Sequence, residues 1–169
     1  MARRLRWYVE AMTIEPALRQ AGSEDREFLF ELHRASMGPY VEELFGPWDV
    51  AVQWEFFDRW FQPEQTFVIS VGDEDVGVVA FEDRPGEVYV TRIEVHPDWQ
   101  RQGVGTAVML GLLDRAHRAG KAVCLHVFGS NPARELYRRL GFTVSSEDGD
   151  RLFMRATPRP SREGAPPQR

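Results

Sequence analysis

The sequence predicts a single mixed α/β domain in which helices and strands alternate along most of the 169 residues. Three observations predict this class. Apolar residues make up 43% of the chain, which is enough to build a core. Residues 66–95 contain three short strand-like runs separated by tight turns, and residues 103–142 alternate helical and strand-like patterns. Strands joined by tight turns are antiparallel, so the first half of the sheet is expected to be antiparallel.

Two helices are expected before this run of strands. Ser23 is a suitable helix start, and Phe28, Leu29 and Leu32 recur at helical spacing behind it. The Gly38-Pro39 pair predicts the end of this first helix, because proline interrupts helical hydrogen bonding. The second helix is expected over residues 49–61.

The remaining elements follow in a regular order. The predicted strands are 66–71, 75–82, 87–95, 122–128, 142–145 and 152–155, and the predicted helices run from the loop 96–102 to Ala119 and over 131–140. Gly120 is expected to cap the longer of these helices at its C-terminus. Residues 142–155 are expected to form a closing hairpin around a turn at 147–150.

The two ends of the chain differ from its body. Residues 1–11 are basic and are interpreted as an extension, with a strand at 7–9 as the alternative and Met12 as a plausible native start. Residues 158–169 contain four prolines and are expected to form a disordered tail. The net charge of the chain is −5, and it becomes −9 once the charges of both ends are set aside.

Charge and composition exclude several function classes. An acidic body lacks the basic face that a nucleic-acid-binding protein needs, and it suits a cationic substrate better. A single cysteine permits no internal disulfide, which is typical of a reducing compartment, so a cytoplasmic location is expected. No apolar run approaches the roughly 20 residues that span a bilayer, so no membrane partner is expected.

The segment most informative about function is residues 93–107, IEVHPDWQRQGVGTA. A strand ends, a polar loop follows, and Gly103 and Gly105 open a helix whose free N–H groups and dipole form an anion site suited to a pyrophosphate. Arg101 adds a positive charge at its rim. A P-loop would need a lysine after the glycines, and a dinucleotide-binding fingerprint would need a third glycine where Val108 stands. A glycine-rich turn without a ligand is the remaining alternative.

A family resemblance favours the pyrophosphate interpretation. The pattern Gln100-x-x-Gly103-x-Gly105, directly after a strand, resembles the acetyl-CoA-binding motif of the GNAT superfamily of N-acetyltransferases. Residues 131–142, NPARELYRRLGF, resemble the second signature of that superfamily, with Ala133 standing one place earlier than in its usual form. The resemblance is specific over residues 66–156 and weak over residues 12–65.

This resemblance implies a fold and a coenzyme site. It implies one GNAT-like domain over residues 12–157, with a splayed, mixed and mostly antiparallel sheet of six to seven strands and about four helices. Coenzyme A would enter the gap between the strands at 87–95 and 122–128, and a backbone N–H near Val95 would stabilise the oxyanion. The residues implied to bind acetyl-CoA are Ile93, Val95, Gln100, Arg101, Gln102, Gly103, Val104, Gly105, Thr106, Asn131 and Arg134.

The resemblance also implies catalytic roles. Tyr137 would protonate the departing thiolate, although a half-buried packing role for this tyrosine is the alternative. Asn131 suits a helix N-cap equally well, and both roles can hold together. Glu94 is the candidate general base for the amine, directly or through water, with a structural ion pair to Arg92 as the alternative. His96 is the second candidate base, and it is also a plausible turn residue.

Residues 40–61 contain eight of the 20 aromatic residues, interleaved with acidic ones. In the resembled fold this stretch covers the acceptor, and Tyr40, Glu43 and Trp48 are the predicted substrate-binding residues, by cation–π contact and charge. Helical spacing makes Trp54, Phe57 and Phe61 core residues instead. His33, His117 and His126 follow no metal-binding pattern and are interpreted as structural, and Cys124 as a small core residue.

The function expected from the resemblance is direct transfer of an acetyl group from acetyl-CoA to an amine, without a metal or a covalent enzyme intermediate. The acceptor is a small molecule or a peptide, and a homodimer is possible because dimers are common among proteins that resemble this one. Two alternatives remain open at this point. One is a non-catalytic acyl-CoA-binding sensor or partner-binding module, and the other is an enzyme that uses a longer acyl-CoA.

Overall fold

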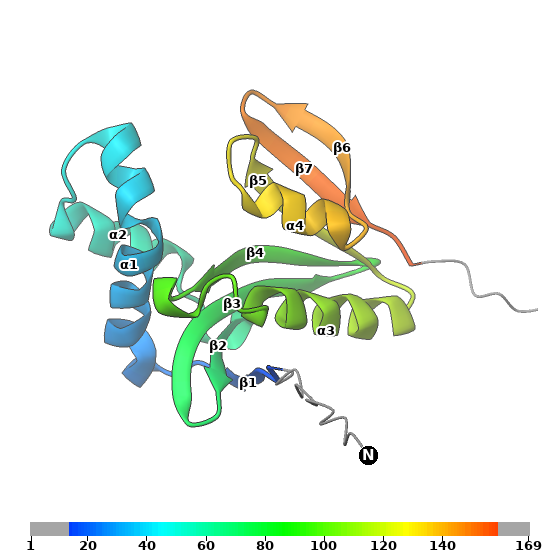
Figure 1. The fold of residues 1–169 in the computed structure, drawn as a ribbon, viewed down its shortest axis with the longest axis horizontal. Helices are drawn as coiled ribbons and strands as arrows, with labels where there is room; N and C mark the ends of the chain where they lie inside the picture. The colour runs from blue at the N-terminus through cyan, green and yellow to red at the C-terminus, as the bar shows by residue number, and fades with distance from the viewer. Residues whose placement is uncertain (1–13, 159–169) are drawn as a thin grey trace, which may run out of the picture.

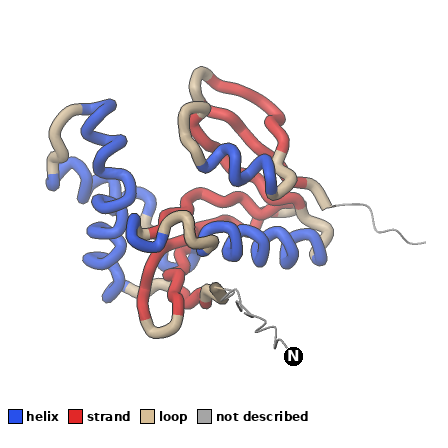
Figure 2. The backbone as a smooth tube through the Cα atoms, viewed as in Figure 1, coloured by secondary structure: helices blue, strands red, loops and turns tan. Residues whose placement is uncertain are grey.

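The computed structural model describes residues 14–158 (Figures 1 and 2). The predicted N-terminal extension, with its alternative strand, and all but the first residue of the predicted tail lie outside these residues. The elements are β1 (Ala17–Gln20), α1 (Arg26–Phe45), α2 (Val50–Trp60), β2 (Thr66–Val71), β3 (Glu74–Arg84), β4 (Glu87–Val95), α3 (Val104–Arg118), β5 (Ala122–Phe128), α4 (Ala133–Arg139), β6 (Thr143–Asp148) and β7 (Arg151–Ala156). Short 3₁₀ turns at Ser23–Asp25, Pro63–Gln65 and Pro97–Trp99 connect several of them.

The seven strands form one sheet in the order β1-β2-β3-β4-β5-β7-β6. Every neighbouring pair is antiparallel except β4 and β5, which run parallel. The predicted mixed α/β class, with a mostly antiparallel sheet of six to seven strands, is confirmed, and the sheet has seven. The sheet is splayed, because β4 and β5 pair only from Glu87 opposite Ala122 to Val90 opposite Leu125 and then diverge. Figure 1 shows the β5–β7–β6 half turned away from β4 beyond this short contact.

A bulge in β4 decides which way its last residues face. Ala80 of β3 pairs with Arg92, and Phe81 pairs with Val90, so Thr91 is an extra residue without a partner in β3. An extra residue reverses the alternation of side chains downstream of it. Val90 and Ile93 therefore face the same core, although simple alternation would place these two residues on opposite faces of the sheet. Glu94 faces the other side.

The two sides of the sheet have separate cores. On one side, α1 and α2 pack on Val68 and Val78 through a cluster that includes Leu29, Phe30 and Phe57. On the other side, α3 and α4 share a larger core with strands β2 to β5 and β7, and Met109 and Met154 are fully buried in it. Figure 1 shows α1 and α2 grouped beside the β2–β4 half of the sheet, with α3 along β4 and α4 along β5.

The N-terminal half contains two departures from the sequence prediction. The predicted break at Gly38-Pro39 is wrong, because α1 continues through Pro39 to Phe45. A proline removes only its own N–H bond, and the buried residues of α1, which include Leu29, Phe30 and Leu32, keep the helix packed on the sheet. The edge strand β1 was not predicted, because its four residues are all exposed and show no alternation.

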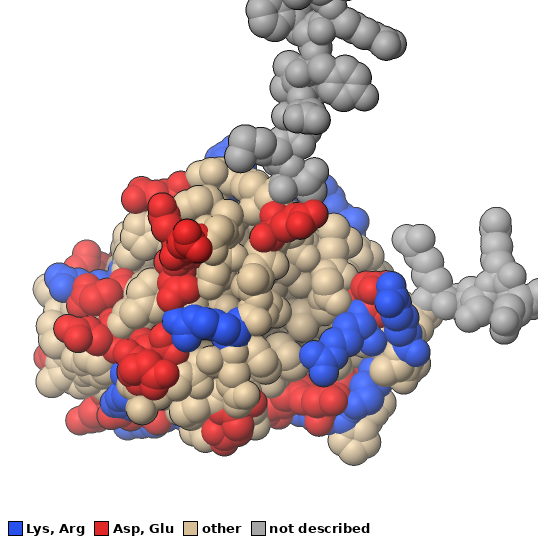
Figure 3. Space-filling model, turned by 90° about the horizontal axis from the view of Figure 1, so that it is seen from below, with Lys and Arg blue, Asp and Glu red and all other residues tan. Residues whose placement is uncertain are grey.

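The surface carries both signs of charge. Seen from below, acidic side chains are most numerous toward the side of α1 and α2, and basic ones gather toward the opposite side (Figure 3). Among the residues that the structure describes, no helix is long and apolar enough to cross a membrane.

Candidate active site

A cleft of about 340 Å³ opens where β4 separates from β5. Four segments line it: the middle of α1, the end of β4, the loop before α3 with the first turn of that helix, and α4 with the two residues before it. Its lining residues are Ser36, Met37, Tyr40, Ile93, Glu94, Val95, Trp99, Gln100, Arg101, Gly103, Gly105, Thr106, Asn131, Pro132, Ala133, Leu136, Tyr137 and Arg139. The cleft thus brings together residues from both predicted signature segments.

The floor of the cleft includes an open strand edge. Residues 91–95 of β4 have no partner on the β5 side, because the pairing ends at Val90. Backbone N–H and C=O groups on such an edge can pair with an extended ligand that carries amide groups. Gln100 Nε2 donates to the Val95 carbonyl oxygen at 2.9 Å, which ties the following loop to the end of this strand.

The loop before α3 places backbone N–H groups at one end of the cleft. Gly103 has φ +90° and Arg101 has φ +60°, both in the left-handed region, and α3 starts directly afterwards. Beyond the adjacent backbone, a Cβ placed on Gly103 or Gly105 would meet no atom of residues 14–158 within 4 Å, so the space beside both glycines is open. Unpaired N–H groups in the first turn of a long helix favour an anion there. The side chain of Val104, a predicted coenzyme-binding residue, is buried in the core and does not line the cleft.

Tyr137 of α4 is buried, and its side chain reaches the cleft. Its ring packs on Phe142 with centroids 5.7 Å apart. Burial disfavours the charged phenolate and raises the pKa of Tyr137 to about 12. The phenol therefore remains protonated at neutral pH and is available as a hydrogen-bond donor.

Two polar residues near the start of α4 support the local backbone. Asn131 Oδ1 accepts a hydrogen bond from the Ala133 N–H at 2.9 Å, so it caps the helix while it also lines the cleft. Arg134 does not line the cleft; its Nη1 donates to the Gly129 carbonyl oxygen at 3.4 Å. Gln102 likewise turns to the loop, where Nε2 donates to the Asp98 carbonyl oxygen at 2.6 Å.

Glu94 is the acidic side chain of the cleft, and it is held by three groups. Arg92 Nη1 forms a short ion pair with Oε1, His33 Nδ1 lies 3.0 Å from the same oxygen, and Ser36 Oγ donates to Oε2 at 3.1 Å. Burial would raise the pKa of Glu94, but the hydrogen bond from His33 and the charge of Arg92 outweigh it and hold this pKa below its ordinary value. Both the predicted cleft position and the alternative Arg92 ion pair are therefore present.

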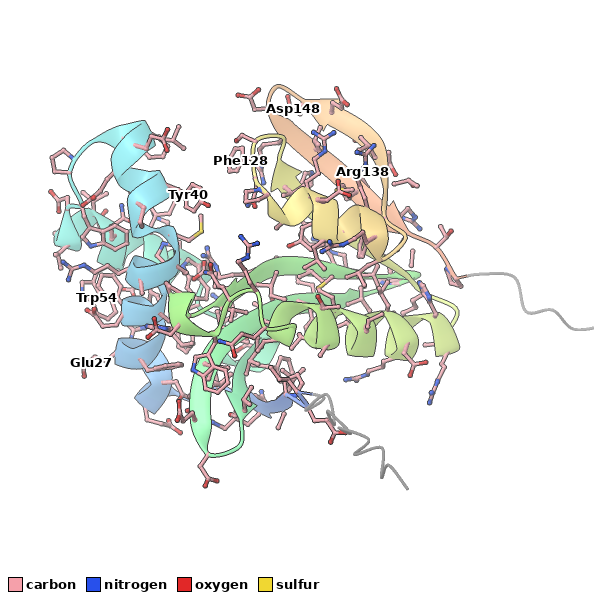
Figure 4. All side chains as sticks on the ribbon, viewed as in Figure 1. Glu27, Tyr40, Trp54, Phe128, Arg138 and Asp148 are labelled. Atoms are coloured by element: carbon pink, nitrogen blue, oxygen red, sulfur yellow. The ribbon has the colours of Figure 1, made fainter. Side chains whose placement is uncertain are left out.

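The three predicted acceptor residues occupy different environments. Tyr40 lines the cleft and is half exposed, and in Figure 4 it projects from α1 toward the side of α4 and β5. Glu43 is exposed and lies outside the lining of the cleft. Trp48 packs under α1, with its ring 6.2 Å from Phe30 and 5.9 Å from His33, and it also lies outside this lining.

This arrangement agrees with a known family. The family model described as "Acetyltransferase (GNAT) family" matches residues 27–142, which is more than half of the chain. The chain belongs to the GNAT family. The match begins inside α1 and includes the loop before α3 and all of α4.

Curated relatives of this GNAT chain match parts of it. A mycothiol acetyltransferase from Thermobifida fusca (strain YX) is 37% identical over 107 residues, which cover 54% of this chain and 32% of that protein. The mouse protein named cysteine-rich protein 2-binding protein is 43% identical over 56 residues, 33% of this chain and 7% of that protein. The chain therefore spans about a third or less of the length of these relatives.

Solved GNAT structures share the fold over most of the chain. The PaiA N-acetyltransferase from Thermoplasma acidophilum, in complex with coenzyme A, has a TM-score of 0.69 at 16% identity and covers 85% of this chain and 99% of its own. The ribosomal-protein-S18-alanine N-acetyltransferase from Escherichia coli has a TM-score of 0.64 at 21% identity and covers 88% and 97%. At identities this low, these structural similarities establish the shared fold alone.

Several residues of this GNAT cleft were not predicted from the sequence. Ser36 and Met37 of α1 are two of them. Together with the predicted Tyr40, and with His33 behind the cleft lining, they recur at helical spacing on one face of α1, a signal that the predicted helix end at Gly38 concealed. His96 turns instead to its own loop, where Nδ1 accepts from the Asp98 N–H at 3.3 Å. Cys124 is fully buried away from the cleft lining. No group of three or more His, Cys, Asp or Glu side chains within residues 14–158 is arranged to hold a metal ion.

Proposed function

We propose that this chain is an N-acetyltransferase that transfers an acetyl group from acetyl-CoA directly to an amine. The observation that carries the proposal is that one cleft joins an open strand edge, a helix N-terminal anion site, a protonated tyrosine and an ionised carboxylate. Each of these features matches a chemical requirement of attack by an amine on a thioester.

The coenzyme requires an anion site next to a polar backbone edge. The N–H groups of residues 103–106 suit the pyrophosphate, and the open edge of β4 at residues 93–95 suits the amides of the pantetheine arm. The space beside Gly103 and Gly105, which a side chain would fill, supports this assignment. Arg101 and Arg139, both at the cleft, add positive charge for the phosphates. Gln102 and Arg134 support the loops that flank this site.

Tyr137 is the proposed general acid. Its side chain lines the cleft, and its raised pKa keeps the proton on the phenol. A thiolate leaving group has an ordinary pKa of about 8.5, so a hydrogen bond from a neutral phenol is sufficient to assist its departure. The N–H groups at the end of β4, near Val95, would stabilise the oxyanion that forms at the acetyl carbonyl.

Glu94 is the proposed general base, acting directly or through a water molecule. An alkylammonium group has a pKa of about 10.4, so only a small fraction is neutral at pH 7 and the amine must lose a proton before attack. Glu94 is ionised and lines the same cleft as Tyr137. Its negative charge also favours the approach of a cationic amine.

The acceptor is proposed to be a small-molecule or peptide amine that enters between α1 and α4. Ser36, Met37 and Tyr40 line this end of the cleft, so it offers one hydroxyl, one flexible apolar side chain and one aromatic face. An aromatic face next to a carboxylate suits a cationic amine. A similar structure is named as an alanine N-acetyltransferase for a ribosomal protein, and a relative is named as a mycothiol acetyltransferase. These names support a peptide amine and a small-molecule amine, respectively, as candidate acceptors.

The first test is a calorimetric titration of the purified chain with acetyl-CoA, free coenzyme A and NAD. We expect binding of acetyl-CoA and coenzyme A but not of NAD. Thiol release in the presence of a panel of amines then separates an enzyme from a binding module. Binding of neither coenzyme would overturn the assignment of the loop at 100–106. Binding without thiol release from any amine would leave a non-catalytic acyl-CoA-binding module.

A further inference from the structure

A small polar cluster is buried between α1 and β4, directly behind the cleft. His33 is 8% exposed and Glu94 is 7% exposed. Burying a carboxylate is costly unless it is paired and hydrogen-bonded. The chain nevertheless keeps this pair, with Arg92 and Ser36, beside the aromatic cluster of α1 and α2, where hydrophobic residues would pack with less cost.

The protonation of the cluster follows from its geometry. His33 Nδ1 lies 3.0 Å from Glu94 Oε1 and 3.3 Å from Arg92 Nη1. A guanidinium can only donate and an ionised carboxylate can only accept, so Nδ1 cannot hydrogen-bond to both. The contact with Glu94 is shorter and joins a donor to an anion, which assigns the hydrogen to Nδ1. His33 therefore donates to Glu94, and the Arg92 contact is a neighbouring charge.

The surroundings limit what else can hold Glu94. From α1 it meets His33 and the Ser36 hydroxyl, and from its own strand it meets Arg92. Of the other neighbouring elements, β3 presents Val78 at the paired position, and α2 presents Trp60, on which the Arg92 guanidinium stacks at 4.0 Å. Among the described residues, His33 and Arg92 are thus the titratable groups that these contacts bring to the carboxylate.

The donors on Glu94 come from two directions. Arg92 stands two residues away on the same strand, on the face of the sheet that Glu94 shares. His33 and Ser36 stand across the interface on α1. Donors on a single strand leave a carboxylate free to rotate with its partner, whereas donors on two facing elements fix its orientation. Glu94 and Ser36 line the cleft, and His33 lies behind this lining.

From this arrangement we propose that His33 is a positioning residue for acetyl transfer, whose Nδ1–H fixes the Glu94 carboxylate at the acceptor end of the cleft. The inference rests on the proposed function of Glu94 as the base. His33 itself does not touch the substrate. Its role is to keep one carboxylate oxygen engaged on the protein side, so that the carboxylate does not turn away with Arg92.

The test compares two substitutions of the same residue. His33→Leu keeps an apolar side chain of similar size but removes the donor. His33→Asn keeps an N–H donor near the position of Nδ1 and cannot carry the charge of an imidazolium. His117→Leu is the control, because His117 is half-buried and hydrogen-bonded, at 3.4 Å to the Ala156 carbonyl oxygen, and it lies outside the cleft.

We expect His33→Leu to lower kcat about ten-fold or more, with the KM for acetyl-CoA unchanged, and His33→Asn to recover most of this loss. The control should keep the wild-type kcat. A second readout is independent of turnover: ¹³C NMR of the Glu94 carboxyl should show a higher titration midpoint in His33→Leu than in the wild type. Thermal melts of each variant establish that it is folded.

Three outcomes would overturn the role of His33. They are a folded His33→Leu variant with wild-type kcat, equal losses in His33→Leu and His33→Asn, and an unchanged Glu94 titration in His33→Leu. Failure of the proposed function would look different from failure of the His33 role. A wild-type chain that binds acetyl-CoA but acetylates no amine would overturn the roles of both Glu94 and His33 in catalysis. In that case a raised Glu94 midpoint in His33→Leu would identify the contact as structural only.

Discussion

A Cβ atom added to Gly77 of β3 would lie 2.6 Å from the backbone oxygen of Glu94 on β4. Glycine is required here because β3 and β4 approach closely at the point where β4 forms the floor of the cleft. Gly77 pairs with Val95 and Val78 pairs with Glu94. A small residue on β3 thus fixes the position of the segment proposed to bind both the coenzyme and the acceptor.

Gly77→Ala is expected to destabilise the fold by about 1–3 kcal/mol, because the added methyl overlaps a backbone atom that cannot move without its strand. Displacement of β4 should also raise the KM for acetyl-CoA. Urea unfolding and steady-state kinetics measure the two effects. Gly111→Ala is the control, since a Cβ at this position of α3 meets no atom within 4 Å. An unchanged stability for Gly77→Ala would mean that the strands separate easily.

Tyr137→Phe is expected to lower kcat about ten-fold or more while the affinity for acetyl-CoA stays nearly constant. The reason is that the substitution removes the proposed proton donor but keeps the ring that packs on Phe142. Stopped assays of thiol release and calorimetry measure the two quantities. Tyr89→Phe removes a hydroxyl that contacts His126 outside the cleft and should leave kcat unchanged. A wild-type rate in Tyr137→Phe removes this residue from the mechanism.

Gly105→Val is expected to weaken acetyl-CoA binding by about a hundred-fold or more, equivalent to about 2.7 kcal/mol. Gly105 is helical and lines the cleft, and beyond the adjacent backbone a Cβ added there meets no atom of residues 14–158 within 4 Å, so the valine would take the volume proposed for the pyrophosphate. Gly103→Val is a less specific test, because φ +90° at Gly103 strains any side chain. Gly111→Val on the same helix should bind normally, and retained affinity in Gly105→Val would contradict the pyrophosphate assignment.

Glu94 is expected to contribute pH-dependent stability. Its folded-state pKa lies below the ordinary value of 4.5, so its stabilisation is complete above about pH 4.5 and is lost as the pH falls through the folded-state pKa. The difference in unfolding free energy between wild type and Glu94→Gln should therefore be about 1–3 kcal/mol at pH 7 and shrink in acid. Urea unfolding at several pH values measures it. Glu55→Gln, at an exposed position on α2, is the control. A difference that is constant with pH would argue against the His33 and Arg92 contacts.

The elements of the chain were largely predictable, because each depends on local patterns. The strand at 122–128 follows from its mostly apolar sequence. The helix at 50–60 follows from its N-cap Asp49, whose side chain accepts from the Ala51 and Val52 N–H groups. Pro39 misled the prediction of α1, because a local rule cannot register that packing along the helix outweighs one lost hydrogen bond. The edge strand β1 could not be predicted, because only its pairing with β2 makes these residues a strand.

By itself, the sequence determined the glycine-rich loop at 100–106 and the second signature segment, because a glycine pair before a helix and a tyrosine at a fixed place on a short helix are local features. Only the tertiary structure decided where Glu94 points. The bulge at Thr91 exists through its register with β3, and it turns Glu94 away from the core of Val90 and toward α1. His33 then meets Glu94 across 61 positions of sequence. Such a contact arises from the packing of a helix on a sheet, and no pattern within either segment contains it.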